Sequence, residues 1–452
     1  MNSIRRLFIA NRGEIAVRII RTCRALGIET VLAVSDADRE SLGAQLADRA
    51  ICIGPGRSSE SYLDGNAHVA AALATGCDAV HPGFGFLSEN SAFARKVIGE
   101  GLIFVGPAPE HLDAVGDKLM ARDHARAAGV PLVPGGQCEC LADAQALGGE
   151  IGYPLLIKAV AGGGGRGMKR VDGPHQLAEQ LDLARSEAET AFGDSRVYVE
   201  RLVTSGRHVE VQIVADGKTV LHAGERDCSV QRRYQKLIEE APAPNLSETL
   251  RDGLRTAAVR FARHIGYRSL GTVEFLVDTE RDSFYFLEMN ARIQVEHPVT
   301  EAITGLDLIA LQLLLAEDRA LTLVQEDIRF VGHAIECRLN AEDIDHDFRP
   351  SPSRINAAWF PALVGLRVDT HVQNGSTIPP FYDSMIAKLI AYGRTRADAI
   401  QTLRVALEVM KVEGVATNAA LHKRILDDAQ FSACDIDTAW LPKFLNRKNS
   451  IH

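Results

Sequence analysis

The feature that most limits the possible folds is a run of four consecutive glycines between two predicted strands. The strands lie at residues 153–160 and 168–171, so the glycines within 161–167 occupy a hairpin loop. P-loop and Rossmann arrangements need a helix to begin directly after their glycines, and they do not fit this order. Glycines allow positive φ and bring backbone N–H groups close to an anion. With Lys158 and Arg166 beside it, the loop favours phosphate binding over a plain flexible turn.

The first 113 residues alternate between short apolar strands and amphipathic helices. Apolar residues recur at helical spacing over 15–26, with Arg18, Arg21 and Arg24 on the opposite, polar face. A strand–helix–strand unit of this kind requires a parallel sheet with a right-handed crossover. The turn at 11–13 lacks the G-x-G-x-x-G pattern, so a supporting domain is favoured over a dinucleotide-binding one. The predicted strands are Leu7–Ala10, Thr30–Val34, Asp78–His81 and Leu102–Val105.

A length of 452 residues suggests about three domains. A helix is predicted from Pro109 to Ala128, and a cluster of proline and glycine at 129–136 reads as a linker. The expected fold class is mixed α/β and α+β. We expect the units 1–113 (βαβ domain), 114–131 (helical linker), 132–203 (small domain with the glycine loop) and 204–452 (larger catalytic and C-terminal domain).

Composition excludes several classes of protein. Lys plus Arg number 50 against 59 Asp plus Glu, and this net charge of −9 argues against a nucleic-acid partner. The most apolar stretch, Leu308–Ala316, is far shorter than the roughly 18 residues that a membrane span needs. The eight cysteines are scattered without zinc-site spacing, and no signal peptide is visible. The sequence therefore predicts a soluble, cytoplasmic protein with reduced thiols and no membrane contact.

Two predicted strands, 271–277 and 283–290, carry acidic residues among Phe and Leu. A symmetric turn between them places Glu274 opposite Phe286, with Glu288 as its diagonal neighbour on the same face and Asn290 two residues further on. Two close carboxylates repel unless a cation lies between them. Oxygen ligands of this kind suit Mg²⁺, so a metal site is favoured over a solvated strand face.

Directly downstream, Arg292, Gln294 and Glu296 place a guanidinium, an amide and a carboxylate within five residues. Such a set can hold a small planar oxyanion in one orientation. His297, followed by proline, is interpreted as structural. A second basic cluster, 231–236, fits ligands for a nucleotide or a small acid better than an RNA-binding patch on an acidic chain.

At this point the sequence resembles the biotin carboxylases of the ATP-grasp superfamily, in family order over residues 4 to about 445. The motifs that carry the resemblance are Asn11–Ala16, His81–Asn90, the glycine loop through Met168, Glu225–Arg233, Glu288–Glu301, Arg338–Asp343 and Tyr382–Lys388. The resemblance implies an ATP-grasp fold with an N-terminal βαβ domain, a small mobile lid and a C-terminal α+β domain. It also implies ATP- and bicarbonate-dependent carboxylation of biotin through carboxyphosphate.

The resemblance assigns roles to residues. The catalytic residues would be Glu296, Arg292, Arg338 and Lys236, with Glu296 as general base. The metal, Mg²⁺ or Mn²⁺, would be held by Glu274, Glu288 and Asn290. Bicarbonate would be held by Lys236, Arg292, Gln294, Val295 and Glu296, and biotin would meet Arg338 and Phe84. ATP would be held by Lys118, Lys158, Gly162, Gly163, Gly164, Gly165, Arg166, Gly167, Glu200, Arg201, Val203, His208, Gln231 and Tyr234.

Departures from the family pattern mark the chain as a divergent member. Tyr234 stands where the best-known bacterial members have His, and Phe84 replaces a Tyr near the biotin site. Ala25 and Val364 replace a Glu and a Phe at the family's dimer contact, although Arg18, Arg21 and Arg367 remain, so a homodimer is still expected.

The expected partners are a separate biotin carboxyl carrier protein and carboxyltransferase subunits of an acetyl-CoA or other acyl-CoA carboxylase. Biotin is not expected on this chain, because Met410-Lys411-Val412 lies in a predicted helix at 397–412 and the chain stops near residue 452. Two other hypotheses are a different ATP-grasp ligase that joins a carboxylate to an amine, and a non-catalytic assembly subunit.

Overall fold

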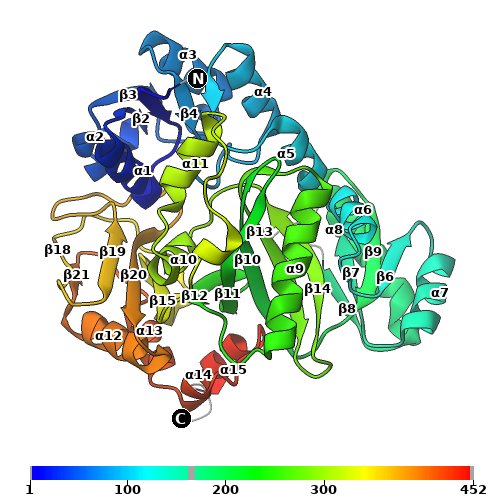
Figure 1. Ribbon diagram of the computed structural model, residues 1–452. Helices are drawn as coiled ribbons and strands as arrows, with labels where there is room; N and C mark the ends of the chain where they lie inside the picture. The colour runs from blue at the N-terminus through cyan, green and yellow to red at the C-terminus, as the bar shows by residue number, and fades with distance from the viewer. Residues whose placement is uncertain (1–2, 161–167, 448–452) are drawn as a thin grey trace.

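The structure, a computed structural model, describes residues 3–160 and 168–447. Its N-terminal part is a five-stranded parallel sheet with the order β3-β2-β1-β4-β5, which confirms the predicted strand–helix alternation. Helices α1 to α4 connect successive strands (Figure 1). The strands are β1 (Arg6–Ile9), β2 (Glu29–Ser35), β3 (Arg49–Gly54), β4 (Ala79–His81) and β5 (Ile103–Phe104), and the helices are α1 (Gly13–Leu26), α2 (Leu42–Leu46), α3 (Gly65–Ala74) and α4 (Ser91–Gly99).

Helix α1 differs from the prediction at one arginine. Arg21 and Arg24 are exposed, as expected for a polar face, but Arg18 is buried. Its guanidinium donates to Glu301 at 2.9 Å and to Asp307 at 2.8 Å. These carboxylates belong to the adjoining helices α10 (His297–Thr304) and α11 (Leu308–Ala316, with Asp307 as N-cap). Helical periodicity could not predict that a distant segment covers this part of the polar face.

The helix predicted from Pro109 to Ala128 is two helices, α5 (Pro109–Gly116) and α6 (Lys118–Ala127). The break lies at Asp117, whose side chain accepts hydrogen bonds from the backbone N–H groups of Leu119 and Met120 at 2.8 and 3.0 Å. An aspartate that caps orphan N–H groups starts a new helix, because it satisfies donors that the first turn leaves open. The cap places Lys118 in the first turn of α6.

A small four-stranded sheet with the order β6-β9-β7-β8 forms a separate lobe at one end of the molecule (Figure 1). The predicted hairpin is confirmed, because β7 and β8 pair antiparallel with Lys158 opposite Met168. The glycines and Arg166 between them lie outside the described residues. The lobe has its own core, in which α8 packs on β7 and β8. Its elements are β6 (Gly135–Cys138), α7 (Leu141–Ile151), β7 (Leu155–Ala159), β8 (Met168–Val171), α8 (Leu177–Phe192) and β9 (Val197–Arg201).

The largest element is an eight-stranded sheet with the order β14-β13-β10-β11-β12-β15-β20-β19. The ladders between its strands are antiparallel. One continuous sheet therefore joins strands that precede and follow α10 and α11. The strands are β10 (Gly206–Asp216), β11 (Val220–Arg232), β12 (Gln235–Ala241), β13 (Arg268–Asp278), β14 (Ser283–Asn290), β15 (His333–Asn340), β19 (Leu366–Thr370) and β20 (Met385–Gly393).

Alternation along β10 separates the two faces of this sheet. Val209, Val211 and Ile213 pack with helix α9 (Glu248–His264) in one apolar cluster. Successive residues of a strand point to opposite faces, so Glu210 and Val214 face the other side. Val214 packs there with apolar residues of α11, and α10 lies against β11, β12, β15 and β20. The buried charges are thus held on the face that α10 covers.

The remaining elements complete the C-terminal part, and one of them corrects the prediction for Met410-Lys411-Val412. Helix α12 (Arg396–Val409) ends before this segment, and Lys411–Glu413 form strand β21, which pairs with β18 (Ala357–Trp359). The helical spacing of apolar residues could not predict that α12 ends at Val409 and that a short strand follows it. The other elements are β16 (Glu342–Asp343), β17 (Arg349–Pro350), α13 (Ala419–Leu426), α14 (Ala429–Ala433) and α15 (Trp440–Arg447).

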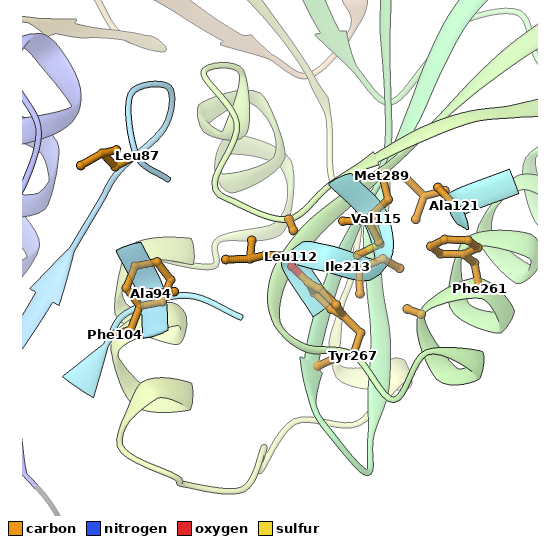
Figure 2. Close-up of a cluster of buried hydrophobic side chains, with 14 of the residues drawn as sticks. Leu87, Ala94, Phe104, Leu112, Val115, Ala121, Ile213, Phe261, Tyr267 and Met289 are labelled. Carbon is orange, nitrogen blue, oxygen red and sulfur yellow. The ribbon is translucent and has the colours of Figure 1, made fainter. Parts of the chain in front are cut away.

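The main hydrophobic core runs from the N-terminal sheet into the large sheet without a break. Figure 2 shows Phe104 on one side, Phe261 on the other and Leu112 of α5 between them. All three side chains are at most 5% exposed. Helix α5 therefore connects the two sheets by packing, and it fixes the N-terminal loops relative to the charged face.

No single helix in the described part of the chain is long and apolar enough to cross a membrane; the pair α10 and α11 meets that test only when taken together, and the two helices are bent by 100°.

Candidate active site

The charged residues of the large sheet form a row across neighbouring strands. Glu288 on β14 pairs with Glu274 on β13, which pairs with Glu210 on β10, which in turn pairs with Arg226 on β11. Residues directly opposite each other in a sheet point to the same face. The row therefore brings three carboxylates and a guanidinium together on one face of the sheet.

Lys236 on β12 lies outside this row, but its ammonium group joins the carboxylates of the row to Glu296. Its ammonium group donates to Glu210 at 2.6 Å, to Glu274 at 3.0 Å and to Glu296 at 2.7 Å. Burial lowers the pKa of an ammonium group, but the acidic groups around Lys236 raise its pKa well above the usual value. The lysine is thus a fixed cation with three bonded carboxylates, and its hydrogen-bonding capacity is used in full.

Glu296 lies between two cations. Its second carboxylate oxygen accepts from Arg338 of β15 at 3.0 Å, and Arg338 also donates to Glu239 at 2.5 Å. Burial alone would raise the pKa of Glu296, but Lys236 and Arg338 hold it well below the usual range. Glu296 is therefore an ionised carboxylate, and its strength as a base depends on how strongly these two cations are engaged elsewhere.

The register of the acidic strand pair corrects the prediction. Glu274 lies directly opposite Glu288, not opposite Phe286, because a bulge between Glu274 and Phe275 shifts the pairing by one residue. The two carboxylates are closer than a diagonal pair would be. His208 and Lys236 hold the pKa of Glu274 below its usual range against the effect of burial, whereas burial and then Glu274 raise the pKa of Glu288.

The donor set at this pair fits a hard divalent cation. Glu288 has no hydrogen bond with any residue of the described chain, which leaves its carboxylate oxygens available as ligands. The amide of Asn290 donates to Glu274 at 2.8 Å and accepts from Arg292 at 3.0 Å. Two carboxylates and an amide oxygen on one face of the sheet match the preference of Mg²⁺ for oxygen ligands. Ligation by Asn290 would require its amide to turn.

Arg292 reaches from this pair toward the N-terminal domain. Its guanidinium donates to Gln294 at 2.7 Å and to Glu89 at 2.9 Å. Glu89 also accepts from the backbone N–H of Ala291 at 3.1 Å. The loop after β4 is thereby tied to the segment that leads to Glu296. Gln294 donates in turn to Glu274 at 3.2 Å, so the predicted anion ligands and the predicted metal ligands form one network.

A second group of cations lies at the edge of the small lobe. Lys158 on β7 forms an ion pair with Glu200 on β9, and Arg122 of α6 approaches the same carboxylate at 3.3 Å. Burial lowers the pKa of Lys118, as does the charge of Lys158, while Glu288 opposes the shift. Lys118 is thus electrostatically coupled both to the lobe and to the acidic pair.

The remaining predicted residues are spread around this group. His208 pairs with Glu274 at 2.7 Å and so belongs to the carboxylate network. Gln231 donates to the backbone carbonyl of Cys228 at 3.3 Å, and Tyr234, at the tip of the β11–β12 hairpin, is 58% exposed. Phe84 is half-buried, and its carbonyl accepts from Asn11 at 2.7 Å. Two more predicted ligands, Arg201 at the end of β9 and Val203 just beyond it, are half-buried.

Sequence reasoning missed three buried residues of the network, and a signal existed for one of them. Glu210 holds both Lys236 and Arg226, and Glu239 holds Arg338. Glu210 lies between Val209 and Val211, whereas Arg226 and Glu239 each have a charged neighbour in their strands. A charged residue between two strand valines is rarely buried unless it is paired, so Glu210 alone could have indicated a buried network.

Comparisons with known proteins give the family of each part of the chain. The family model for the biotin carboxylase N-terminal domain matches residues 3–112, and that for the C-terminal domain matches residues 336–443. Between them, residues 117–324 match the ATP-binding domain of the carbamoyl-phosphate synthase L chain.

Whole-length relatives agree with these matches. Biotin carboxylase 1 of Bacillus subtilis is 48% identical over 98% of this chain and 99% of its own length. A biotin carboxylase from Campylobacter jejuni, solved as a β,γ-ATP complex, is 43% identical with a TM-score of 0.94 and coverage of 98% and 99%. The biotin carboxylase domain dimer of Hydrogenobacter thermophilus 2-oxoglutarate carboxylase, solved with MgADP, ADP and bicarbonate, is 40% identical with a TM-score of 0.92 and coverage of 99% of each chain.

Proposed function

The chain belongs to the biotin carboxylase family and carries out the ATP-dependent carboxylation of biotin, and from that premise we propose how its residues divide the reaction. The observation that carries the proposal is the bond of Lys236 to Glu296, with Arg338 on the other oxygen of the same carboxylate. A base held between two cations suits a substrate that is itself an anion and must lose a proton. The family findings favour this activity over a different carboxylate–amine ligase and over a non-catalytic subunit.

Bicarbonate would bind against Lys236, Arg292, Gln294, Val295 and Glu296. When it engages Lys236 and Arg292, those cations stabilise the carbonate form and so lower the pKa of bicarbonate. When Lys236 engages bicarbonate, its hold on Glu296 weakens, and Glu296 becomes a stronger base. The proton would pass from bicarbonate to Glu296, and a carbonate oxygen would attack the γ-phosphorus of ATP. The products of this step are ADP and carboxyphosphate.

Carboxyphosphate then breaks into CO₂ and phosphate. The phosphate would take the proton from N1 of biotin, and N1 would attack CO₂. Negative charge develops on the ureido oxygen of biotin during this step, and Arg338 is the cation that we assign to it. We assign Phe84 to the biotin site as well, and two contacts of its loop, Asn11 with the Phe84 carbonyl and Glu89 with Arg292, support a fixed position for it.

The nucleotide would lie between the small lobe and the acidic strand pair. We assign its phosphates to Lys118, Lys158 and the loop of Gly162 to Gly167 with Arg166, and its base and ribose to Glu200, Arg201, Val203, His208, Gln231 and Tyr234. Glu274, Glu288 and Asn290 would hold Mg²⁺, which when bound neutralises charge on the phosphates. The lobe formed by residues 132–203 would act as a lid over the nucleotide. We propose that the rest of the chain divides into a βαβ domain (1–113), a helical linker (114–131) and a catalytic and C-terminal domain (204–452).

A structure with MgADP and bicarbonate tests these assignments. Bicarbonate is expected within hydrogen-bond distance of Arg292, Lys236 and Glu296, with the metal between Glu274 and Glu288. The site assignment fails if bicarbonate binds away from Glu296, or if Arg292 stays paired with Gln294 and contacts no anion.

We further propose a biotin carboxyl carrier protein and carboxyltransferase subunits as partners, in an acetyl-CoA or other acyl-CoA carboxylase. A role as one subunit of a larger carboxylase is supported by the likeness to a structure described as the biotin carboxylase subunit of pyruvate carboxylase, 42% identical with a TM-score of 0.85. A homodimer is proposed because Val364 is fully exposed, next to a cavity of about 440 Å³ that Arg18 and Arg367 line. Eight unpaired cysteines support a reducing, cytoplasmic location. Capture of the biotinylated partner from the native host, and the mass of the protein in solution, test these points.

A further inference from the structure

Lys388 of β20 is a fully buried lysine that the proposed chemistry does not use. In the large sheet it stands opposite Arg338 on β15 and opposite Asp369 on β19. Its side chain therefore lies on the same face as Arg338. A buried ammonium group is costly unless charges and acceptors satisfy it, so its contacts carry information about why it is there.

Two contacts hold the ammonium group, and they come from distant segments. Lys388 donates to the backbone carbonyl of Val295 at 2.7 Å. It also lies 3.1 Å from the carboxylate of Glu14 in helix α1. Val295 directly precedes Glu296, and Glu296 is the N-cap of α10. The lysine thus touches the peptide that leads into the proposed base and, on its other side, the first turn of the N-terminal domain's first helix.

The other acidic residues near Lys388 do not bond its ammonium group, so Val295 and Glu14 are its two close contacts among the described residues. Glu14 is buried and makes no hydrogen bond with any described residue, so its ion pair with Lys388 is its closest stabilising contact. Glu336 is also fully buried, and burial raises its pKa well above the usual range. Asp369 is already held by Arg367 at 2.6 Å. Burial lowers the pKa of Lys388, but Glu14, Glu336 and Asp369 raise it, so the lysine stays charged.

We infer that Lys388 is a positioning residue for the carboxylation reaction, which orients Glu296 by holding the carbonyl of Val295, while Glu14 tethers the lysine to the N-terminal domain. Lys388 then holds the carbonyl of Val295, while Lys236 and Arg338 hold the side chain of the next residue, Glu296. A displacement of about 1 Å at a reacting group costs up to about 100-fold in rate. The inference rests on the proposed role of Glu296.

The test compares two variants that both lack the ion pair. Glu14→Gln keeps Lys388 and its bond to Val295, whereas Glu14→Gln with Lys388→Met also removes that bond without leaving a buried carboxylate alone. The double variant is expected to lose at least ~10-fold in kcat for bicarbonate-dependent ADP release relative to Glu14→Gln, with an unchanged KM for ATP. If Lys388 only stabilised the fold, its replacement would not lower kcat, and the two variants would have the same kcat.

Lys423→Met is the matched control, because the lysine that it replaces, in α13, forms an exposed ion pair with Glu408 at 2.9 Å and bonds no residue of the proposed site. It should leave kcat and the thermal midpoint unchanged. Equal kcat values for the two Glu14 variants overturn the inference, as does a loss in kcat that only parallels a lower thermal midpoint. If the unaltered protein itself fails to carboxylate biotin, the proposed function fails instead, so the two failures are distinguishable.

Discussion

Two lysines, Lys158 in the small lobe and Lys236 in the large sheet, hold substrate phosphate and bicarbonate in our proposal, but they are built into the protein differently. Lys158 shares one carboxylate, Glu200, with Arg122. Lys236 bonds three carboxylates at once. Strand β7, which carries Lys158, has five residues. Strands β10 and β13, which carry Glu210 and Glu274, have 11 residues each.

This difference indicates which part of the active site has its geometry set before substrate binds. The bicarbonate side is a closed network on long paired strands, so its geometry is set before substrate arrives. The nucleotide side depends on a short hairpin and a cation that has one carboxylate partner to exchange for phosphate. Substitutions should therefore affect turnover and folding on the first side, and substrate affinity on the second.

The largest effect is expected at Glu296. Glu296→Gln keeps the size of the side chain but removes the base, so biotin carboxylation should fall by about 1,000-fold or more. Nucleotide affinity should stay the same, because Lys158 and Glu200 are untouched. Steady-state kinetics measure the carboxylation rate, and calorimetry measures the affinity for ATP. A loss of less than about tenfold would remove Glu296 as the base.

The next effect is expected at Lys236. Lys236→Met leaves Glu210, Glu274 and Glu296 facing one another without their shared cation, and breaking a buried network in this way costs about 3–5 kcal/mol of unfolding free energy. Turnover should fall by about 100-fold as well, because a bicarbonate ligand is lost. Denaturant unfolding of the unaltered and variant proteins gives the difference. A cost below about 1 kcal/mol would contradict a closed network.

A smaller effect is expected at Lys158. Lys158→Gln should raise the KM for ATP by about tenfold and leave the KM for bicarbonate unchanged. The unfolding free energy should fall by only about 1 kcal/mol, because Arg122 remains beside Glu200. If Lys158→Gln destabilises the protein as much as Lys236→Met, the contrast between the two sides is wrong.

The smallest effect on turnover is expected at Glu239, where the sign of a pH effect can be tested. Burial, with a contribution from Glu296, raises the pKa of Glu239 to about 7 against the opposing effect of Arg338. The unfolded value is about 4.3, so between these pH values the folded state binds more protons and its stability falls as pH rises.

Glu239→Gln removes this titration but keeps an oxygen acceptor for Arg338. Its unfolding free energy relative to the unaltered protein should rise by on the order of 3 kcal/mol from pH 4.3 to 7, and stay constant above pH 7. Urea unfolding at a series of pH values measures it. A difference that does not change across this range, or that changes with the opposite sign, would show that Glu239 is already ionised at pH 4.3.

Much of the fold and of the site could be predicted from the sequence. The hairpin around the glycines, the parallel N-terminal sheet and the acidic strand pair all follow from local patterns. The register of Glu274 could not be predicted, because a single bulged residue shifts every later pair by one.

Contacts between distant segments could not be predicted either. Arg18 reads as part of a polar helix face, yet α10 and α11 cover it. The sequence likewise does not show that Lys236 is the partner of Glu210, or that Glu14 of helix α1 is the partner of Lys388. Residue identity and spacing predicted a phosphate loop, a metal site and an anion site, and the family resemblance indicated the reaction. Only the tertiary structure shows which charges hold one another.

The central claim is that Glu296 couples bicarbonate to ATP cleavage for transfer to biotin. The most direct test incubates the purified protein with ATP, Mg²⁺, free biotin and ¹³C-bicarbonate, and measures ADP and labelled carboxybiotin together by mass spectrometry. We predict that the unaltered protein forms both products and that formation depends on bicarbonate, while Glu296→Gln forms neither above background. Labelled carboxybiotin formed at an undiminished rate by Glu296→Gln would contradict the account.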